Sequence, residues 1–255
     1  MALEYNLDFI SDKSKKSNIK KAISSLEKAY YTSRETSSFF LDPFERSVIG
    51  DIARKNNIDL VFLGGNERAE RQIFVANPYY EPLNSEDYIR VLEFESLDIK
   101  HPDVLGALIH LGLDRERIGD IEVNDGRCEF VVLKEDGPFV KYNLSKIKNE
   151  GVSIDFKPSN ELRVVEAAYI EKSGFVSSLR LDNIVSLLLS TSRSKVKEFI
   201  NKSQVKVNYQ TITDLAYKVE ENSMISIRGV GRFIFDGVSG RSKKDNYHIE
   251  YRKLV

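Results

Sequence analysis

The sequence of 255 residues is 41% hydrophobic and 30% charged with a net charge of −1, which fits a globular protein of two or three domains. A chain of this length buries enough core to fold without metal ions, and its single cysteine, Cys128, excludes an internal disulfide and fits a reducing compartment. No apolar run approaches the roughly 18 residues of a membrane span, and Met1–Ile10 alternates charged and apolar residues instead of forming a secretion signal, so we expect a cytoplasmic protein.

The N-terminal region, residues 1–82, is predicted to be an α+β domain. Apolar residues recur with a period close to 3.6 over Asn18–Tyr31, which indicates a helix. A second helix is expected to begin at Asp42, a suitable N-cap, followed by Pro43 at the first helical position, and to end near Lys55. Two short apolar strands should follow, over Asp59–Leu63 and Gln72–Ala76.

Residues 83–160 are predicted to form a middle domain with the order βαββαβ, the ferredoxin-like arrangement shared with RNA-recognition motifs (RRMs). Its third strand, Arg127–Val131, lacks the paired aromatic residues on which working RRMs stack bases. We therefore expect this RRM-like domain to serve packing or docking, with direct contact to RNA as the alternative. Its predicted elements, in chain order, are Tyr88–Phe94, His101–Leu111, Ile118–Val123, Cys128–Leu133, Pro138–Lys148 and Val152–Phe156.

The third predicted domain, residues 179–255, reads as two helices followed by short strands. Ile184, Leu187 and Leu188 mark the apolar face of the first helix, and Ser192 caps the second. The strands are expected over Gln204–Tyr209 and Met224–Arg228. Residues 181–255 contain 13 Lys and Arg against 8 Asp and Glu, a balance of +5, which leaves −6 for the rest. A basic domain on an acidic body is typical of a protein with one anionic partner and one docking face.

Cations gather around the second of these helices. On a helical wheel, Arg193 and Lys197 flank its apolar face on one side, and Lys195 and Lys202 flank it on the other. The free N–H groups at a helix start, together with nearby cations, form a phosphate-binding site by simple electrostatics. Further polar and basic residues follow on the strands. The pattern predicts nucleic-acid binding.

Here the sequence resembles the S4 domain, a small RNA-binding fold, at the C-terminal end of a YlmH-family protein. The S4-like motifs are Leu179-Arg180-Leu181-Asp182, Ser192-Arg193, Val205-Lys206-Val207-Asn208 and Ile225-Ser226-Ile227-Arg228-Gly229. The motifs similar to the YlmH family are Gly229-Val230-Gly231-Arg232-Phe233, Phe40-Leu41-Asp42-Pro43, Phe62-Leu63-Gly64-Gly65, His101 to Gly106 and Ile118-Gly119-Asp120. The resemblance covers nearly the whole chain.

The resemblance implies that a C-terminal S4 domain of the αL type binds structured rRNA and tRNA on the large ribosomal subunit. Family members are linked to ribosome-associated quality control and to cell-division gene neighbourhoods. Asp182 is expected to orient a cation or cap the first helix. The implied RNA contacts are Arg180, Ser192, Arg193, Lys195, Lys197, Lys206, Asn208, Arg228 and Arg232.

Two turns depart from the usual S4 pattern. The turn before the first strand usually contains glycine, but here it reads Lys202-Ser203-Gln204, and the later turn, often Gly-Asp, reads Asn222-Ser223. Asparagine accepts a left-handed backbone well and serine poorly. The first hairpin is therefore expected to be looser or differently shaped.

Enzyme functions find little support. Arg180-Leu181-Asp182 resembles a pseudouridine synthase motif, but no synthase-sized domain follows it. Three scattered histidines and one cysteine leave no metal set. Asp120 and Glu122, close on a predicted strand, are expected to face solvent. We expect no catalytic residues, no metal and no cofactor.

The hypotheses for function are thus three. In the first, the protein is a ribosome-associated RNA-binding adaptor whose acidic domains position it or recruit a protein partner. In the second, it is a protein-interaction factor in cell division with incidental RNA affinity. In the third, it is an RNA-modifying enzyme, which would need a cleft of convergent acidic or nucleophilic residues in the first two domains.

Overall fold

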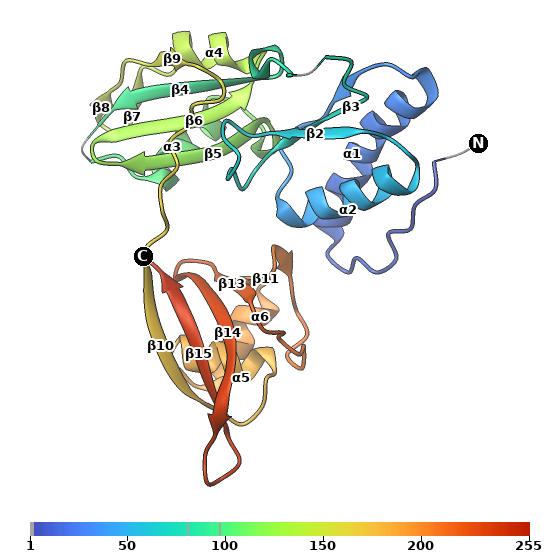
Figure 1. Ribbon diagram of the computed structural model, residues 1–255. Helices are drawn as coiled ribbons and strands as arrows, with labels where there is room; N and C mark the ends of the chain where they lie inside the picture. The colour runs from blue at the N-terminus through green and yellow to red at the C-terminus, as the bar shows by residue number, and fades with distance from the viewer. Residues whose placement is uncertain (1–2, 81, 97) are drawn as a thin grey trace. The chain divides into compact units, whose positions relative to one another are not determined.

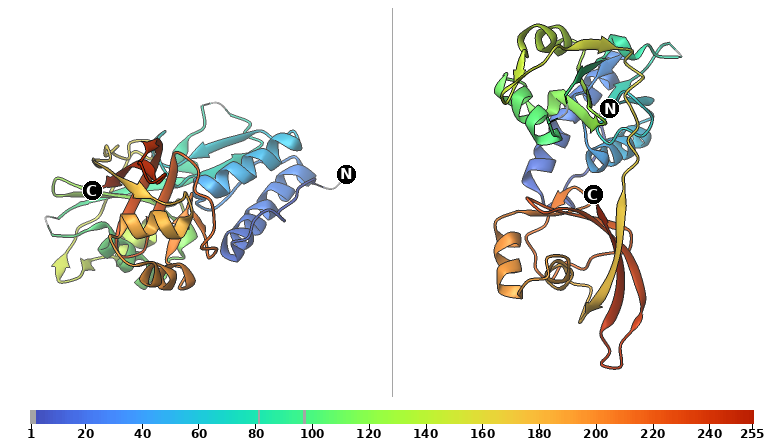
Figure 2. Two further views of the ribbon diagram at one scale, coloured as in Figure 1. Left: turned by 90° about the horizontal axis from the view of Figure 1, so that it is seen from below. Right: turned by 90° about the vertical axis from the view of Figure 1, so that its left-hand side faces the viewer.

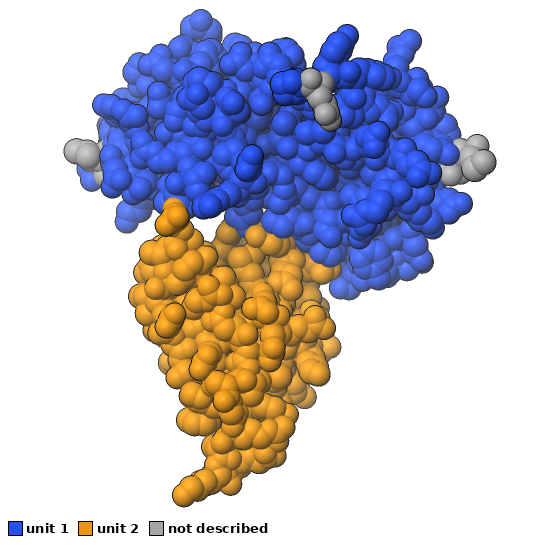
Figure 3. All heavy atoms as spheres, in the orientation of Figure 1, with its two compact units in different colours: residues 1–165 blue, residues 166–255 orange. Residues whose placement is uncertain are grey.

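The computed structural model describes residues 3–80, 82–96 and 98–255, so the first two residues of the alternating N-terminal segment lie outside the described residues. The chain divides into two compact units, residues 1–165 and 166–255 (Figure 3). Helices and sheets occur in both units, which confirms the predicted α+β class. The predicted boundary between residues 82 and 83 falls inside the first unit and stays a prediction.

The N-terminal part of the first unit packs two helices on a three-stranded antiparallel sheet of order β1-β3-β2 (Figure 1). The first helix begins before the predicted Asn18, because the carboxylate of Asp12 accepts hydrogen bonds from the N–H groups of Ser14 and Lys15, at 2.9 and 3.2 Å. The elements are α1 (Lys13–Thr32), β1 (Thr36–Ser37), α2 (Pro43–Lys55), β2 (Leu60–Leu63) and β3 (Ile73–Ala76).

Helix α2 begins where the sequence predicts. Asp42 is its N-cap and forms a capping box with Glu45, in which each side chain accepts the backbone N–H of the other residue, at 3.1 and 3.0 Å. The buried ammonium group of Lys15 from α1 donates to both carboxylates. This buried ion pair joins the two helices at the start of α2.

The middle part of the first unit is a four-stranded antiparallel sheet of order β5-β6-β4-β9. Numbered by their order within this part, the strands lie 2-3-1-4, and with one helix in each crossover this is the predicted ferredoxin-like arrangement. The elements are β4 (Ile89–Glu95), α3 (His101–His110), β5 (Ile118–Asn124), β6 (Arg127–Leu133), α4 (Asp136–Asn143) and β9 (Asp155–Lys157).

The predicted helix Pro138–Lys148 is wrong in its second half. Helix α4 ends at Asn143, and Lys146–Ile147 (β7) pairs instead with Glu150–Gly151 (β8). Lys148, in the turn between them, has a φ of 53°, outside the helical region. The residues after Leu144 therefore form a small hairpin.

The C-terminal unit packs two helices against one face of a six-stranded antiparallel sheet of order β10-β15-β14-β13-β11-β12 (Figures 1 and 2). Strand β10 pairs with β15 along its full length, so this unit begins at Glu166, ahead of the predicted Leu179. The elements are β10 (Tyr169–Val176), α5 (Leu181–Leu188), α6 (Arg193–Asn201), β11 (Val205–Val207), β12 (Gln210–Thr211), β13 (Ser223–Ile227), β14 (Gly231–Arg241) and β15 (Tyr247–Leu254).

Over the part of the chain that the structure describes, no helix is both long and apolar enough to cross a membrane.

Candidate nucleic-acid interface

Helix α6 places a cationic turn at the edge of a cleft. It begins at Arg193 with Ser192 as its N-cap, as the sequence predicts, and its first turn reads Arg193-Ser194-Lys195-Val196. The guanidinium of Arg193 donates to the hydroxyl of Ser177 at 3.0 Å, which joins α6 to the connection between β10 and α5. The exposed N–H groups at the helix start and the Arg193 charge attract anions at the same place.

The cleft at this end of α6 has a volume of about 420 Å³ and is rich in hydroxyl groups. Hydroxyls and guanidinium groups are the usual donors to phosphate oxygens and ribose. Phe175, 56% exposed, lines the same cleft and packs against His248, with ring centroids 4.7 Å apart and a tilt of 39° between the ring planes. The lining residues are Phe175, Val176, Ser177, Asn183, Ser186, Leu187, Ser190, Thr191, Ser192 and Arg193.

Arg180 is held at the start of α5 by a neighbouring carboxylate. Its Nε and Nη2 atoms donate to the two oxygens of Asp182, at 3.1 and 3.0 Å. These hydrogen bonds raise the pKa of the Arg180 guanidinium above its ordinary value. Asp182 therefore orients a cation, one of the two roles expected for it.

The remaining α6 cations lie on both sides of its buried face. Lys195 and Lys197 are exposed and flank the buried Val196, as the helical wheel predicts. Lys197 follows Arg193 by one turn, so these two side chains are neighbours on one edge of the helix. Lys195 points to the other edge.

The predicted strand cations lie on the sheet face that the helices do not cover. Lys206, Ser226 and Arg232 are partners in register across β11, β13 and β14, so their side chains share one face. Val205 and Val207, on either side of Lys206, are buried with the helix residues. The nine predicted residues are therefore spread over two faces of the C-terminal unit.

Arg228 and Asn208 occupy turns. Arg228 follows β13, and its N–H donates to the carbonyl of Gln204 at 2.9 Å, which fixes the hairpin to the end of α6. Asn208 has a φ of 46°, and its side-chain oxygen accepts the N–H of Met224 at 2.9 Å. Holding this turn occupies the Asn208 carbonyl group, so its amide is less free for RNA than the sequence alone indicates.

The sheet face of the RRM-like part that would stack bases is covered. Phe40, Ile73 and Leu162 pack on its strands β4 and β6. A Cβ atom at Gly119 would lie 2.8 Å from the Phe40 ring, so this contact requires glycine. Glu129 on β6 is 1% exposed and accepts from Lys157 Nζ at 3.0 Å. A covered face with a carboxylate on it is unsuited to base stacking, and the packing or docking role of this part stays a prediction.

Asp120 and Glu122 are half-buried, whereas the sequence led us to expect that they face solvent. A β-bulge after Ile118 turns Asp120 toward the N-terminal part, where it accepts the N–H groups of Glu70 and Arg71 at 2.5 and 3.0 Å. Burial raises the pKa of the Asp120 carboxyl, and burial together with nearby carboxylates raises the pKa of Glu122 to about 7.

The arginines beside Asp120 support the fold. Arg71 donates through Nε to the carbonyl of Ile118 at 3.0 Å and through Nη2 to that of Phe40 at 2.9 Å. Burial lowers the pKa of Arg71, and it lowers that of Arg115 to about 10. These carbonyl contacts make the cluster a structural network.

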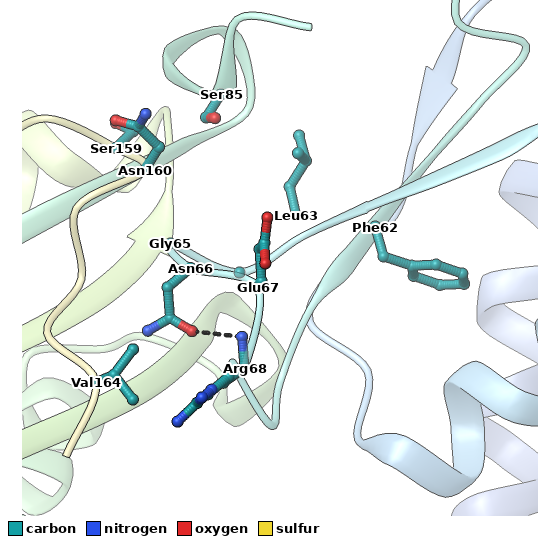
Figure 4. Close-up of a pocket in the computed structure, with 11 residues that line it drawn as sticks. Phe62, Leu63, Gly65, Asn66, Glu67, Arg68, Ser85, Ser159, Asn160 and Val164 are labelled. Atoms are coloured by element: carbon teal, nitrogen blue, oxygen red, sulfur yellow. Dashed lines mark hydrogen bonds between the residues drawn. The ribbon is translucent and has the colours of Figure 1, made fainter. Parts of the chain in front are cut away.

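A second cleft, of about 500 Å³, lies beside the loop after β2 (Figure 4). Asn66 accepts the N–H of Arg68 at 2.8 Å and donates to the carbonyl of Leu162 at 3.0 Å. Gly65, with a φ of 93°, packs so closely that a Cβ atom would lie 2.9 Å from Leu162. Among the described residues, no group of three or more His, Cys, Asp or Glu is placed to hold a metal ion.

Comparison with known proteins gives two family matches. Residues 92–161 match the family described as a putative RNA-binding domain in YlmH, and residues 179–225 match the S4 domain. The solved structure of a cell division protein ylmH from Streptococcus pneumoniae covers 61% of this chain and 96% of its own, with a TM-score of 0.53 and 17% identity, a likeness in fold.

The chain is also similar to the ribosome-associated protein quality control protein P2 of Bacillus subtilis (strain 168). The two are 30% identical over 219 residues, which make up 84% of this chain and 85% of the relative. The S4 match coincides with the unit that carries the α6 cleft. The chain belongs to the YlmH family of RNA-binding proteins with a C-terminal S4 domain.

Proposed function

We propose that this protein binds rRNA and tRNA on the large ribosomal subunit and acts in ribosome-associated quality control in the cytoplasm. The observation that carries the proposal is the first turn of α6, where Arg193 and Ser192 border a hydroxyl-lined cleft. The similarity to a ribosome-associated quality control protein supports it. In this role the protein is an adaptor and performs no catalysis.

Phosphate groups bind at the α6 cleft because positively charged side chains and hydrogen-bond donors lie together there. Arg193 and Lys197 supply two exposed cations one turn apart, and the cleft supplies hydroxyl donors. Lys195, Lys206, Arg228 and Arg232 extend the positive field to other sides of the unit. Such a distribution suits an RNA that wraps around a small domain and is bound through its backbone.

Sucrose-gradient sedimentation of the tagged protein from a cell lysate tests the proposal. The wild type should travel with ribosomes or large subunits, and Arg193→Ala/Lys197→Ala should stay near the top. The control Arg54→Ala/Lys55→Ala removes the same charge from exposed positions at the end of α2, outside both matched RNA-binding regions, and should travel like the wild type. If all three proteins stay at the top at low salt, the ribosomal proposal fails.

A second candidate, a protein-interaction factor in cell division, has its own structural support. Helix α4 exposes Phe139 and Tyr142, which are 46% and 80% accessible and lie on one side of the helix. Exposed aromatic side chains on one helix face are typical of protein docking sites. A pull-down that retains a protein partner after RNase treatment and recovers no rRNA would favour this candidate.

A further inference from the structure

The solvent face of α1 is strongly basic, although the chain outside residues 181–255 is net acidic. Helix α1 contains six lysines and one glutamate. Lys15 is buried in the ion pair with α2, and the other lysines reach the surface. The N-terminal part therefore presents a local positive face that the overall charge conceals.

The exposed lysines and one tyrosine line up along the helix. Lys13, Lys20 and Tyr31 are separated by 7 and 11 residues, which places all three on one side of a helix with 3.6 residues per turn. Lys21 and Lys28 lie next to this line. We call these five residues the α1 stripe, and it extends about 27 Å along the helix.

Acidic residues lie within the stripe and at its flanks. Glu27 of α1 follows Lys20 by seven residues and lies on the same side of the helix, where the four stripe lysines outnumber it. Lys21 pairs with Glu116 at 3.3 Å, and Lys16, beside the stripe, pairs with Asp8 at 3.5 Å. Exposed ion pairs of this kind contribute little and are screened by salt. The stripe therefore keeps a positive field that favours an anionic partner.

Exposed tyrosines gather at the C-terminal end of the stripe. Tyr31 is 61% exposed and meets Tyr30 edge-on at 5.3 Å between ring centroids. The hydroxyl of Tyr79 donates to the carbonyl of Ser33, which follows α1 directly, so the loop after β3 lies against this helix end. Tyr79 and Tyr80 are 62% and 77% exposed.

We propose that the α1 stripe and these tyrosines form a second RNA-binding surface, separate from the S4 unit. The lysines contact consecutive phosphates, and an unpaired base stacks on the tyrosine rings. Phosphate neutralisation by lysine and stacking on aromatic rings are the two interactions that hold single-stranded segments of RNA. This surface goes beyond the proposed function, which rests on α6.

RNA fits this surface better than a lipid membrane does. An amphipathic helix binds a membrane by inserting its apolar face, but the apolar face of α1, with Ile19 and Leu26, is fully buried in the core of the first unit. The side that remains exposed is polar and charged except for the tyrosines.

The test uses the full-length chain and a fluorescein-labelled RNA hairpin with a single-stranded tail, followed by fluorescence anisotropy from about 50 to 300 mM KCl. For Lys13→Ala/Lys20→Ala, the negative slope of log affinity against log salt concentration should become shallower by about 1.5, because two phosphate contacts are lost. Tyr80→Ala should weaken binding roughly 5-fold or more, and Tyr80→Phe should restore it, because stacking needs the ring alone.

Two comparisons separate this proposal from the proposed function. Arg54→Ala/Lys55→Ala carries the same charge change on α2 of the first unit and should keep the wild-type slope. If the α1 variants behave like this control while Arg193→Ala/Lys197→Ala loses affinity, the second surface is overturned and the S4 proposal stands. If only the α1 variants lose affinity, the second surface stands and the S4 proposal fails.

The same variants test the lipid alternative by flotation with phosphatidylglycerol vesicles. Loss of vesicle binding in Lys13→Ala/Lys20→Ala with unchanged RNA affinity would assign the stripe to membranes and overturn the proposal.

Discussion

Replacing Ser203 by glycine should stabilise the C-terminal unit. Ser203 lies just past the end of α6 with a φ of 56°. Its N–H donates to the carbonyl of Ile200 at 3.0 Å, and the N–H of Gln204 donates to that of Phe199 at 3.0 Å. This is the Schellman arrangement, whose left-handed position glycine normally occupies.

The expected gain follows from two opposing terms. A left-handed backbone costs a non-glycine residue about 1–2 kcal/mol, and the greater entropy of glycine in the unfolded chain offsets about 0.5–1 kcal/mol of this. Ser203→Gly should therefore raise the free energy of unfolding by about 0.5–1 kcal/mol. For a unit of this size, the melting temperature should rise by roughly 3–6 °C.

Thermal denaturation of the full-length protein followed by circular dichroism measures this change, with hydrogen exchange at the amides of β13 to assign the transition to the C-terminal unit. The control Ser226→Gly lies in the extended strand β13, where glycine should lower stability by about 0.5–1 kcal/mol. An unchanged or lower melting temperature for Ser203→Gly would refute the argument from backbone strain.

Three further substitutions test the first unit by chemical denaturation. Gly65→Ala should destabilise it by about 1–3 kcal/mol, because the new Cβ meets Leu162 at 2.9 Å, whereas Gly112→Ala, also at positive φ but in open space, should cost less. An equal loss for both would contradict the packing argument. Glu122→Gln should gain stability on the order of 1 kcal/mol at pH 8 and little at pH 5. The pKa of Glu122 is about 7 in the folded state, above its unfolded value, so the wild type loses stability as the pH rises from the unfolded to the folded pKa. A gain in stability that does not depend on pH would exclude the ionisation of Glu122 as its cause. Lys15→Met should lower the free energy of unfolding by about 3–5 kcal/mol, because the two carboxylates at the start of α2 are left buried without their cation. A loss below about 1 kcal/mol would show that these carboxylates are solvated.

Local signals in the sequence predict local structure well. Asp42 followed by Pro43 fixes the start of α2 at the observed residue. Ser192 is the N-cap of α6 as predicted, but its side chain makes no capping hydrogen bond to the helix backbone. Ser203 and Asn222, in the two turns where the S4 pattern usually has glycine, both have positive φ, 56° and 62°. The looser or differently shaped first hairpin stays a prediction.

Features that depend on residues far apart in the sequence could not be predicted from local sequence patterns. Strand β14 contains two bulges opposite β15, at Asp236 and Ser239, which break its period of two. The covered face of β6 depends on Phe40 and Leu162, far away in sequence. The net negative charge outside residues 181–255 gave no indication of the basic stripe on α1, although the helical spacing of its lysines predicts it.

The nine predicted RNA contacts show the same difference between local sequence signals and long-range strand pairing. Residue type identified the cations, and helical periodicity correctly placed Arg193 and Lys197 on one side of α6. Strand register, which the sequence did not supply, puts Lys206 and Arg232 on the opposite face of the sheet from the helices. Their joint contribution to RNA binding stays a prediction.

The most direct test of the central claim is the salt dependence of binding to purified bacterial large ribosomal subunits. The log of the affinity of the wild type should fall linearly with the log of the KCl concentration, and the slope for Arg193→Ala/Lys197→Ala should be shallower by about 1.5. A double variant that binds the subunits with the wild-type affinity and slope would contradict the assignment of the α6 cleft as the RNA-binding site.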